Sequence, residues 1–141
     1  MLRDRLHQLD HEYGDFDAHN GLWEMAVHTA ENVMIRMALV PRVLEARGLD
    51  VTPGMIKKLK EHGDENTAII LKTIFDDEIG HVAIGSHWFN YACEQLDVDP
   101  EKTFKLLLNK HFTGRLRGPF ELVARSKAGF TSFDLETIQG I

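Results

Sequence analysis

One segment limits the fold of this chain more than any other. From about residue 65 to residue 96, apolar side chains recur at helical spacing without interruption. Asp64 precedes the segment as a capping residue, and Gly63 is a suitable stop for whatever comes before it. A second long helical pattern covers residues 21–47, with Asn20 as its predicted cap. Because no alternating strand pattern occurs anywhere, we expect an all-α protein.

The second long pattern is followed by several helix-breaking residues. Pro41 lies inside the pattern, where it should kink or end the helix, because proline lacks an amide hydrogen and clashes with the preceding turn. Gly48 is the expected stop. Thr52 and Pro53 then suit the start of a short basic helix over residues 53–62.

Shorter segments complete the predicted organisation. A chain of 141 residues is long enough for a single domain with a real core. We therefore expect an all-α helical bundle with small helices appended. The further predicted helices span residues 2–8, 100–111, 121–127 and 132–137, and the predicted loops span residues 11–20 and 113–118.

Two glycines stand inside the longest predicted helix. Gly80 and Gly85 each cost about 1 kcal/mol relative to alanine in a helix interior. Close packing against another helix, or room around a bound group, would explain that cost.

Composition excludes several classes of function. The net charge of −6 disfavours binding to nucleic acid. No segment reaches the roughly 20 apolar residues of a membrane-spanning helix, and no apolar run follows the charged N-terminus as a signal peptide requires. A lone cysteine, Cys93, forms no internal disulfide, and its apolar neighbours predict a buried thiol. These features fit a cytoplasmic protein.

Glu78 and His81 are the first candidate metal ligands. They are three residues apart on the longest helix, so they share one face, and a Glu-x-x-His pair places a carboxylate and an imidazole near a single ion. Asp76 and Asp77 point elsewhere around the helix, so these acids cannot all be ligands. The alternative is an ordinary solvated pair or a core histidine.

Glu45 is the third candidate ligand. It lies near the C-terminal end of the other long helix, where a negative charge is unfavourable unless a cation compensates it. That cation is either a metal ion or one of the neighbouring side chains Arg42 and Arg47, and the residues alone leave both readings open.

Several segments resemble the second half of a ferritin-like family of unknown function, within the wider class of di-iron and di-manganese carboxylate proteins. The similarity covers nearly the whole chain, and its long helix-joining motif is specific. The segments are residues 39–54 (LVPRVLEARGLDVTPG), 77–85 (DEIGHVAIG), 13–16, 21–24 and 116–120.

This resemblance implies a set of ligand roles. The class uses a glutamate from each of two helices and a Glu-x-x-His pair from each of the other two. Glu45 matches a single glutamate and would be a terminal ligand, while Glu78 would bridge two metals and His81 would be the second terminal ligand. The implied cofactor is iron or manganese, which the oxygen and nitrogen donors favour over zinc. No catalytic residue is indicated.

The two helices that carry the other three ligands in such proteins have no counterpart in this sequence. Three explanations stay open: the chain is part of a longer product, two copies complete the bundle as a homodimer, or the site is incomplete and empty. The leading hypothesis is a di-metal protein with oxygen or redox chemistry, such as an oxidase or hydroxylase. Its rivals are a non-catalytic helical dimer or partner-binding module, and a zinc site with three protein ligands and water. The substrate is not indicated.

Overall fold

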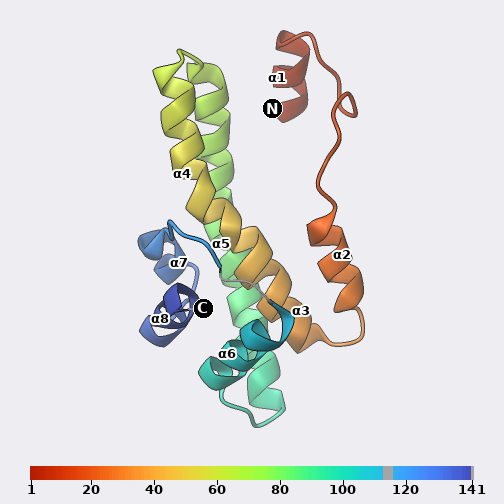
Figure 1. Ribbon diagram of the computed structural model, residues 1–141, viewed down its shortest axis with the longest axis vertical. Coiled ribbons are helices and arrows are strands. Elements are labelled where there is room, and N and C mark those ends of the chain that lie inside the picture. Colours follow the sequence, from red (N-terminus) through yellow and green to blue (C-terminus); the bar gives the residue numbers. More distant parts are fainter. Residues whose placement is uncertain (113–115, 141) are drawn as a thin grey trace.

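The computed structural model describes residues 1–112 and 116–140, and within them every regular element is helical. The expected all-α class is therefore confirmed (Figure 1). In chain order the elements are α1 (Leu2–Gln8), α2 (Gly21–His28), α3 (Val33–Leu39), the π-helical segment η1 (Val40–Glu45), α4 (Ala46–Glu61), α5 (Glu65–Gln95), α6 (Pro100–His111), α7 (Leu122–Lys127) and α8 (Ser132–Gly140).

Two long helical rods form the centre of the molecule. The elements α3, η1 and α4 follow one another without a break and pack along α5, which returns beside them (Figure 1). Gly63 makes the turn between the rods with a φ of +80°. Asp64 then caps α5 as predicted, because its carboxylate accepts a hydrogen bond of 3.0 Å from the Thr67 amide. This antiparallel pair carries all of the candidate ligands.

The C-terminal helices cover one end of the central pair. α6 begins at Pro100 after the predicted cap Asp99, whose side chain accepts from the Lys102 amide at 2.9 Å. α6, α7 and α8 then pack against α3, α5 and one another, and they enclose the larger part of the core. Cys93 is fully buried in this core, as its neighbours predicted, and burial raises the pKa of its thiol.

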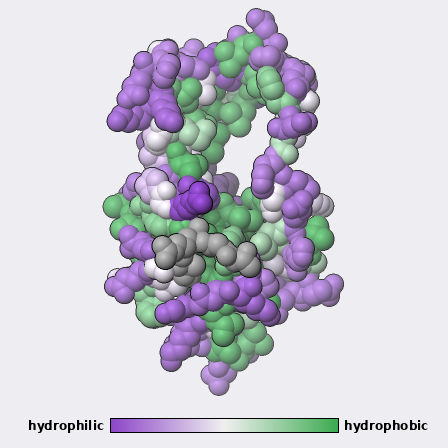
Figure 2. Space-filling view, in the orientation of Figure 1, coloured by the Kyte–Doolittle hydropathy of each residue, from purple (hydrophilic) through white to green (hydrophobic). Residues whose placement is uncertain are grey.

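The N-terminal residues form an arm rather than a layer. α1, the loop after it and α2 contain no buried residue except at the end of the arm, where Thr29 is buried. Arg5 ties α1 to the start of α5 through a 2.8 Å ion pair with Asp64 and a 2.8 Å hydrogen bond to Thr67. Figure 2 shows an opening between this arm and the central pair.

The predicted helix over residues 21–47 is wrong in its continuity. α2 ends at His28, and α3 restarts after Asn32, whose side chain accepts a 3.0 Å hydrogen bond from the Ile35 amide. A short polar side chain that caps the next helix competes with helix continuation, which explains the break. Asn20 is the cap residue of α2 as predicted, but its side chain makes no capping bond.

The predicted stop at Gly48 and restart at Pro53 are also wrong, because α4 runs through both positions. Its buried face, which includes Ala46 and Leu49, packs against α5. That packing outweighs the weak helix propensity of one glycine and one proline. Of the predicted loop over residues 113–118, the first three residues lie outside the described part of the chain, and residues 116–118 are non-helical.

The α-helix α3 ends at Leu39, just before Pro41 as predicted, but the chain continues as a π-helical segment. The chain passes through η1, and the Ala46 amide donates to the Pro41 carbonyl five residues earlier, as in a π-helix. The Pro41 ring lies against the backbone of α5 at Gly85, where a Cβ atom would collide with the ring. The prediction of close packing is thus confirmed for Gly85. At Gly80 a Cβ atom would meet nothing within 4 Å.

No helix of the described ranges is long and apolar enough to cross a membrane, which agrees with the expectation from the sequence.

Gly85 and Gly80 provide a matched test of the packing between the two rods. We expect Gly85→Ala to lower the free energy of unfolding by about 1–3 kcal/mol, because the new methyl group forces Pro41 away from α5. Gly80→Ala should raise it by up to about 1 kcal/mol, because the added methyl group improves helix propensity in open space. Urea unfolding of both variants measures the two effects, and equal shifts would contradict the packing described here.

Candidate metal centre

The three predicted ligands line one cavity of about 460 Å³. Glu45 comes from the end of η1, whereas Glu78 and His81 come from the middle of α5. The rest of the lining is mainly apolar and includes Leu22 at the edge contributed by α2. The complete lining is Leu22, Leu44, Glu45, Gly48, Thr52, Ile74, Phe75, Glu78 and His81.

Glu78 and His81 contact each other directly. His81 Nδ1 lies 3.2 Å from Glu78 Oε2, one helical turn away. The Glu78 side chain is 21% exposed and the His81 side chain is 64% exposed. The carboxylate therefore lies inside the cavity, and the imidazole lies at its open edge.

Glu45 is partly buried and faces these two groups. Burial is the main cause that raises its pKa, the nearby Glu78 charge raises it further, and His81 opposes the shift. Two carboxylates that face one partly buried cavity repel each other unless a proton or a cation lies between them. The donor set, two carboxylates and an imidazole, is the kind that a transition metal takes up.

The arginine alternative for Glu45 is not what the structure contains. Among the ion pairs of the described residues, Arg42 binds Asp134 at 2.7 Å and Arg47 lies 3.5 Å from Asp50. None of these pairs includes Glu45. Its negative charge is therefore left to a proton, to water or to a metal ion.

The ligand set is open. Within residues 1–112 and 116–140, no three or more His, Cys, Asp or Glu side chains form a group that could hold a metal ion as they stand. Glu45, Glu78 and His81 therefore share one cavity, but as they stand they do not form a group that could hold a metal ion. The neighbouring acid Asp76 pairs with Lys72 at 2.6 Å on the surface, and neither it nor the exposed Asp77 lines the cavity, as the helical geometry predicted.

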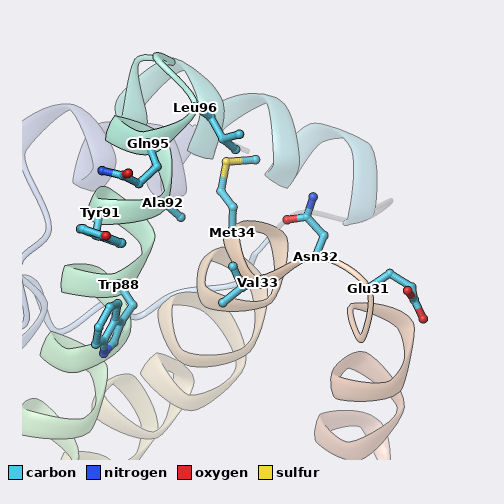
Figure 3. A pocket seen from close by; sticks show the side chains of 9 residues that line it. All are labelled: Glu31, Asn32, Val33, Met34, Trp88, Tyr91, Ala92, Gln95 and Leu96. Atoms are coloured by element: carbon cyan, nitrogen blue, oxygen red, sulfur yellow. The ribbon is translucent and has the colours of Figure 1, made fainter.

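A second, apolar cavity of about 460 Å³ lies further along α5 (Figure 3). Trp88 and Tyr91 project from α5, with ring centroids 5.6 Å apart, and Met34 projects from α3 beside Leu96. His81, Trp88 and Tyr91 are spaced seven and three residues apart, so they lie along one side of α5. An exposed apolar strip thus continues from the candidate ligands toward the end of the helix.

Sequence reasoning missed two buried ion pairs near the ligands. Arg42 pairs with Asp134, and Arg125 pairs with Asp50 at 2.7 Å, all with side chains at most 4% exposed. Arg42 follows Pro41 within a run of apolar residues, and Arg125 directly follows the apolar run of residues 122–124. A basic residue on a predicted apolar helix face was the available signal.

Comparison with known proteins identifies the family. The family model described as "Protein of unknown function (DUF455)" matches residues 1–136, and the chain belongs to that family. An uncharacterized protein of Haemophilus influenzae is 46% identical over 138 residues, which cover 98% of this chain and 48% of that protein. The chain therefore spans about half the length of this relative. No solved structure matches the chain.

The raised pKa of Glu45 predicts a pH-dependent effect in metal-free protein. Between the unfolded value of 4.5 and the raised folded value, the folded chain binds more protons than the unfolded one, so stability falls as pH rises through this window. We expect Glu45→Gln to raise the unfolding free energy at pH 7 by up to about 1 kcal/mol and to have little effect near pH 4. Urea unfolding with a chelator present measures both values, and an equal effect at the two pH values would contradict the assignment.

Proposed function

We propose that this chain is a metal-binding protein of the ferritin-like class, in which Glu45, Glu78 and His81 form half of a di-iron or di-manganese carboxylate centre. The observation that supports the proposal most directly is that these three side chains, drawn from two separate rods, line a single cavity. Nothing in the sequence spacing requires residues 33 positions apart to meet, whereas a shared metal site does.

Each residue has a role in this proposal. Glu78 is only 21% exposed and contacts His81, which suits a carboxylate that bridges two ions. Glu45 and His81 line the same cavity and would be the terminal ligands. Because Glu45 holds its proton more tightly than an ordinary glutamate, a divalent cation would displace that proton on binding and relieve the repulsion from Glu78.

The donor set favours iron or manganese over zinc, because carboxylates predominate and the thiol of Cys93 is buried in the core away from the cavity. When bound, a centre of this class supplies oxygen or redox chemistry, as in an oxidase or hydroxylase. The chain's own contribution is to hold two carboxylates and an imidazole in an apolar cavity whose walls include Ile74 and Phe75.

The remaining ligands would come from a second helix pair. Such a pair would also cover the apolar side chains that α2 and α5 leave exposed, among them Trp23 at 67%, Ile84 at 59% and Trp88 at 48%. Two sources fit: a further segment of a longer polypeptide, as the length of the Haemophilus relative suggests, or a second copy of this chain in a homodimer.

The open ligand set favours one alternative function. If no further ligands arrive, the chain is a non-catalytic helical dimerisation or partner-binding protein with a vestigial site. The exposed apolar strip on α5 would then be an interface alone.

Metal titration tests the leading proposal. We expect Mn²⁺ or Fe²⁺, added without oxygen, to raise the melting temperature of the purified chain, because a ligand that binds only the folded state stabilises it. Glu78→Ala and His81→Ala should each weaken metal binding about tenfold or more. Asp77→Asn, an exposed position outside the cavity, is the matched control and should leave affinity unchanged.

Light scattering of the same samples measures the molar mass and shows whether the chain dimerises when the metal binds. If neither cation changes the melting temperature and the chain dimerises without metal, the proposed metal site is wrong and the interface-only function holds.

A further inference from the structure

We propose that Arg42 and Arg125 are positioning residues for Glu45, acting from outside the metal cavity through the π-helical segment η1. This inference rests on the function proposed above. Neither arginine lines the cavity that contains Glu45, Glu78 and His81. Both hold the backbone on either side of Glu45 by means of the C-terminal helices α7 and α8.

The π-helical turn makes external support necessary. In an α-helix, residues three apart lie on one face. Within the wider turn of η1, Arg42 extends into the aromatic core beneath α6 and α8, while Glu45 enters the candidate metal cavity. A π-helical turn has weaker intrinsic support than an α-helical one. The direction of Glu45 therefore depends on whatever holds this turn in place.

Arg42 holds the first half of the turn. Its guanidinium lies 4.8, 4.3 and 4.7 Å from the ring centroids of Phe89, Phe104 and Phe130. Its Nη2 donates to Asp134 Oδ2 at 2.7 Å, and the Arg42 side chain is 1% exposed. Arg42 is thus fixed by three elements, α5, α6 and the α7–α8 region, three residues before Glu45.

Arg125 holds the second half. Its Nη2 donates to the Ala46 carbonyl at 3.3 Å, on the residue directly after Glu45. The same guanidinium binds Asp50 with two hydrogen bonds, at 2.9 Å from Nε and 2.7 Å from Nη2. Asp50 also accepts from the Glu121 amide at 3.0 Å, which ties the start of α7 to α4. The first turn of α4, which begins directly after Glu45, is therefore clamped to α7.

Stability alone does not explain this arrangement. Buried ion pairs seldom stabilise a fold more than apolar side chains of the same size, because both charges lose their hydration. Two such pairs, Arg42 with Asp134 and Arg125 with Asp50, flank the one π-helical turn of the described chain. What they add is a fixed direction for the backbone between them, which carries the Glu45 carboxylate.

The test compares Arg125→Lys with a packing control. Lysine keeps the charge beside Asp50 but loses the fork that reaches both Asp50 and the Ala46 carbonyl. The control is Ile138→Val, which loosens the buried face of α8 without touching either ion pair. We expect Arg125→Lys to weaken Mn²⁺ binding about tenfold, the usual size of an effect transmitted to a ligand, and Ile138→Val to leave it unchanged.

Amide hydrogen exchange separates this inference from the proposed function. Exchange at residues 44–48 should rise in Arg125→Lys, and it should stay at the wild-type level in Ile138→Val. If the wild-type chain binds no Mn²⁺, the proposed function fails, and the exchange at residues 44–48 still decides whether Arg125 holds the turn. Unchanged exchange there, or equal loss of Mn²⁺ affinity in both variants, overturns the positioning role.

Discussion

The contact between the Pro41 ring and the backbone of α5 at Gly85 is the constraint on which the rest of this structure depends. A proline in the middle of a long rod removes a hydrogen bond and crowds the preceding turn, so the rod must bend, end or widen. Here it widens into η1, and the absence of a side chain at Gly85 lets the two rods stay close at that point. The rod then continues into α4 with its buried face still against α5.

That widened turn determines where Glu45 lies. It places Glu45 opposite Glu78 and His81, in a cavity whose other walls are mostly apolar. Burial and the second carboxylate together raise the pKa of Glu45, so the ionised form of Glu45 is disfavoured in this cavity. The turn also directs Arg42 into the core, where Asp134 of α8 neutralises its charge. Arg125 of α7 reaches toward the turn and is neutralised by Asp50 of α4.

Local patterns in the sequence predicted most of the helices because capping and apolar spacing act over a few residues. Asp64 and Asp99 mark the starts of α5 and α6 correctly. The same reasoning failed at Gly48 and Pro53, where burial against α5 overrides local propensity. At Pro41 it predicted the end of the α-helix but not the π-helical continuation, which packs against a glycine 44 positions later.

The candidate site divides in the same way. Glu78 and His81 are recognisable from spacing on one helix, whereas Glu45 was joined to them through a family resemblance, and its place in the same cavity is a tertiary result. The buried partners of Arg42 and Arg125 lie 92 and 75 residues away, beyond the reach of any local pattern. Long-range pairing of charged groups is therefore the part of this structure that local sequence patterns could not predict.

Anomalous X-ray diffraction from crystals grown with Fe²⁺ or Mn²⁺, recorded at the edge of each metal and at the zinc edge, shows whether a metal ion binds in this cavity. We expect a metal peak about 2.0–2.3 Å from donor atoms of Glu45, Glu78 and His81 together. A metal peak at another position, or no peak in this cavity in crystals grown with the metal, would show that these three residues do not form a metal site.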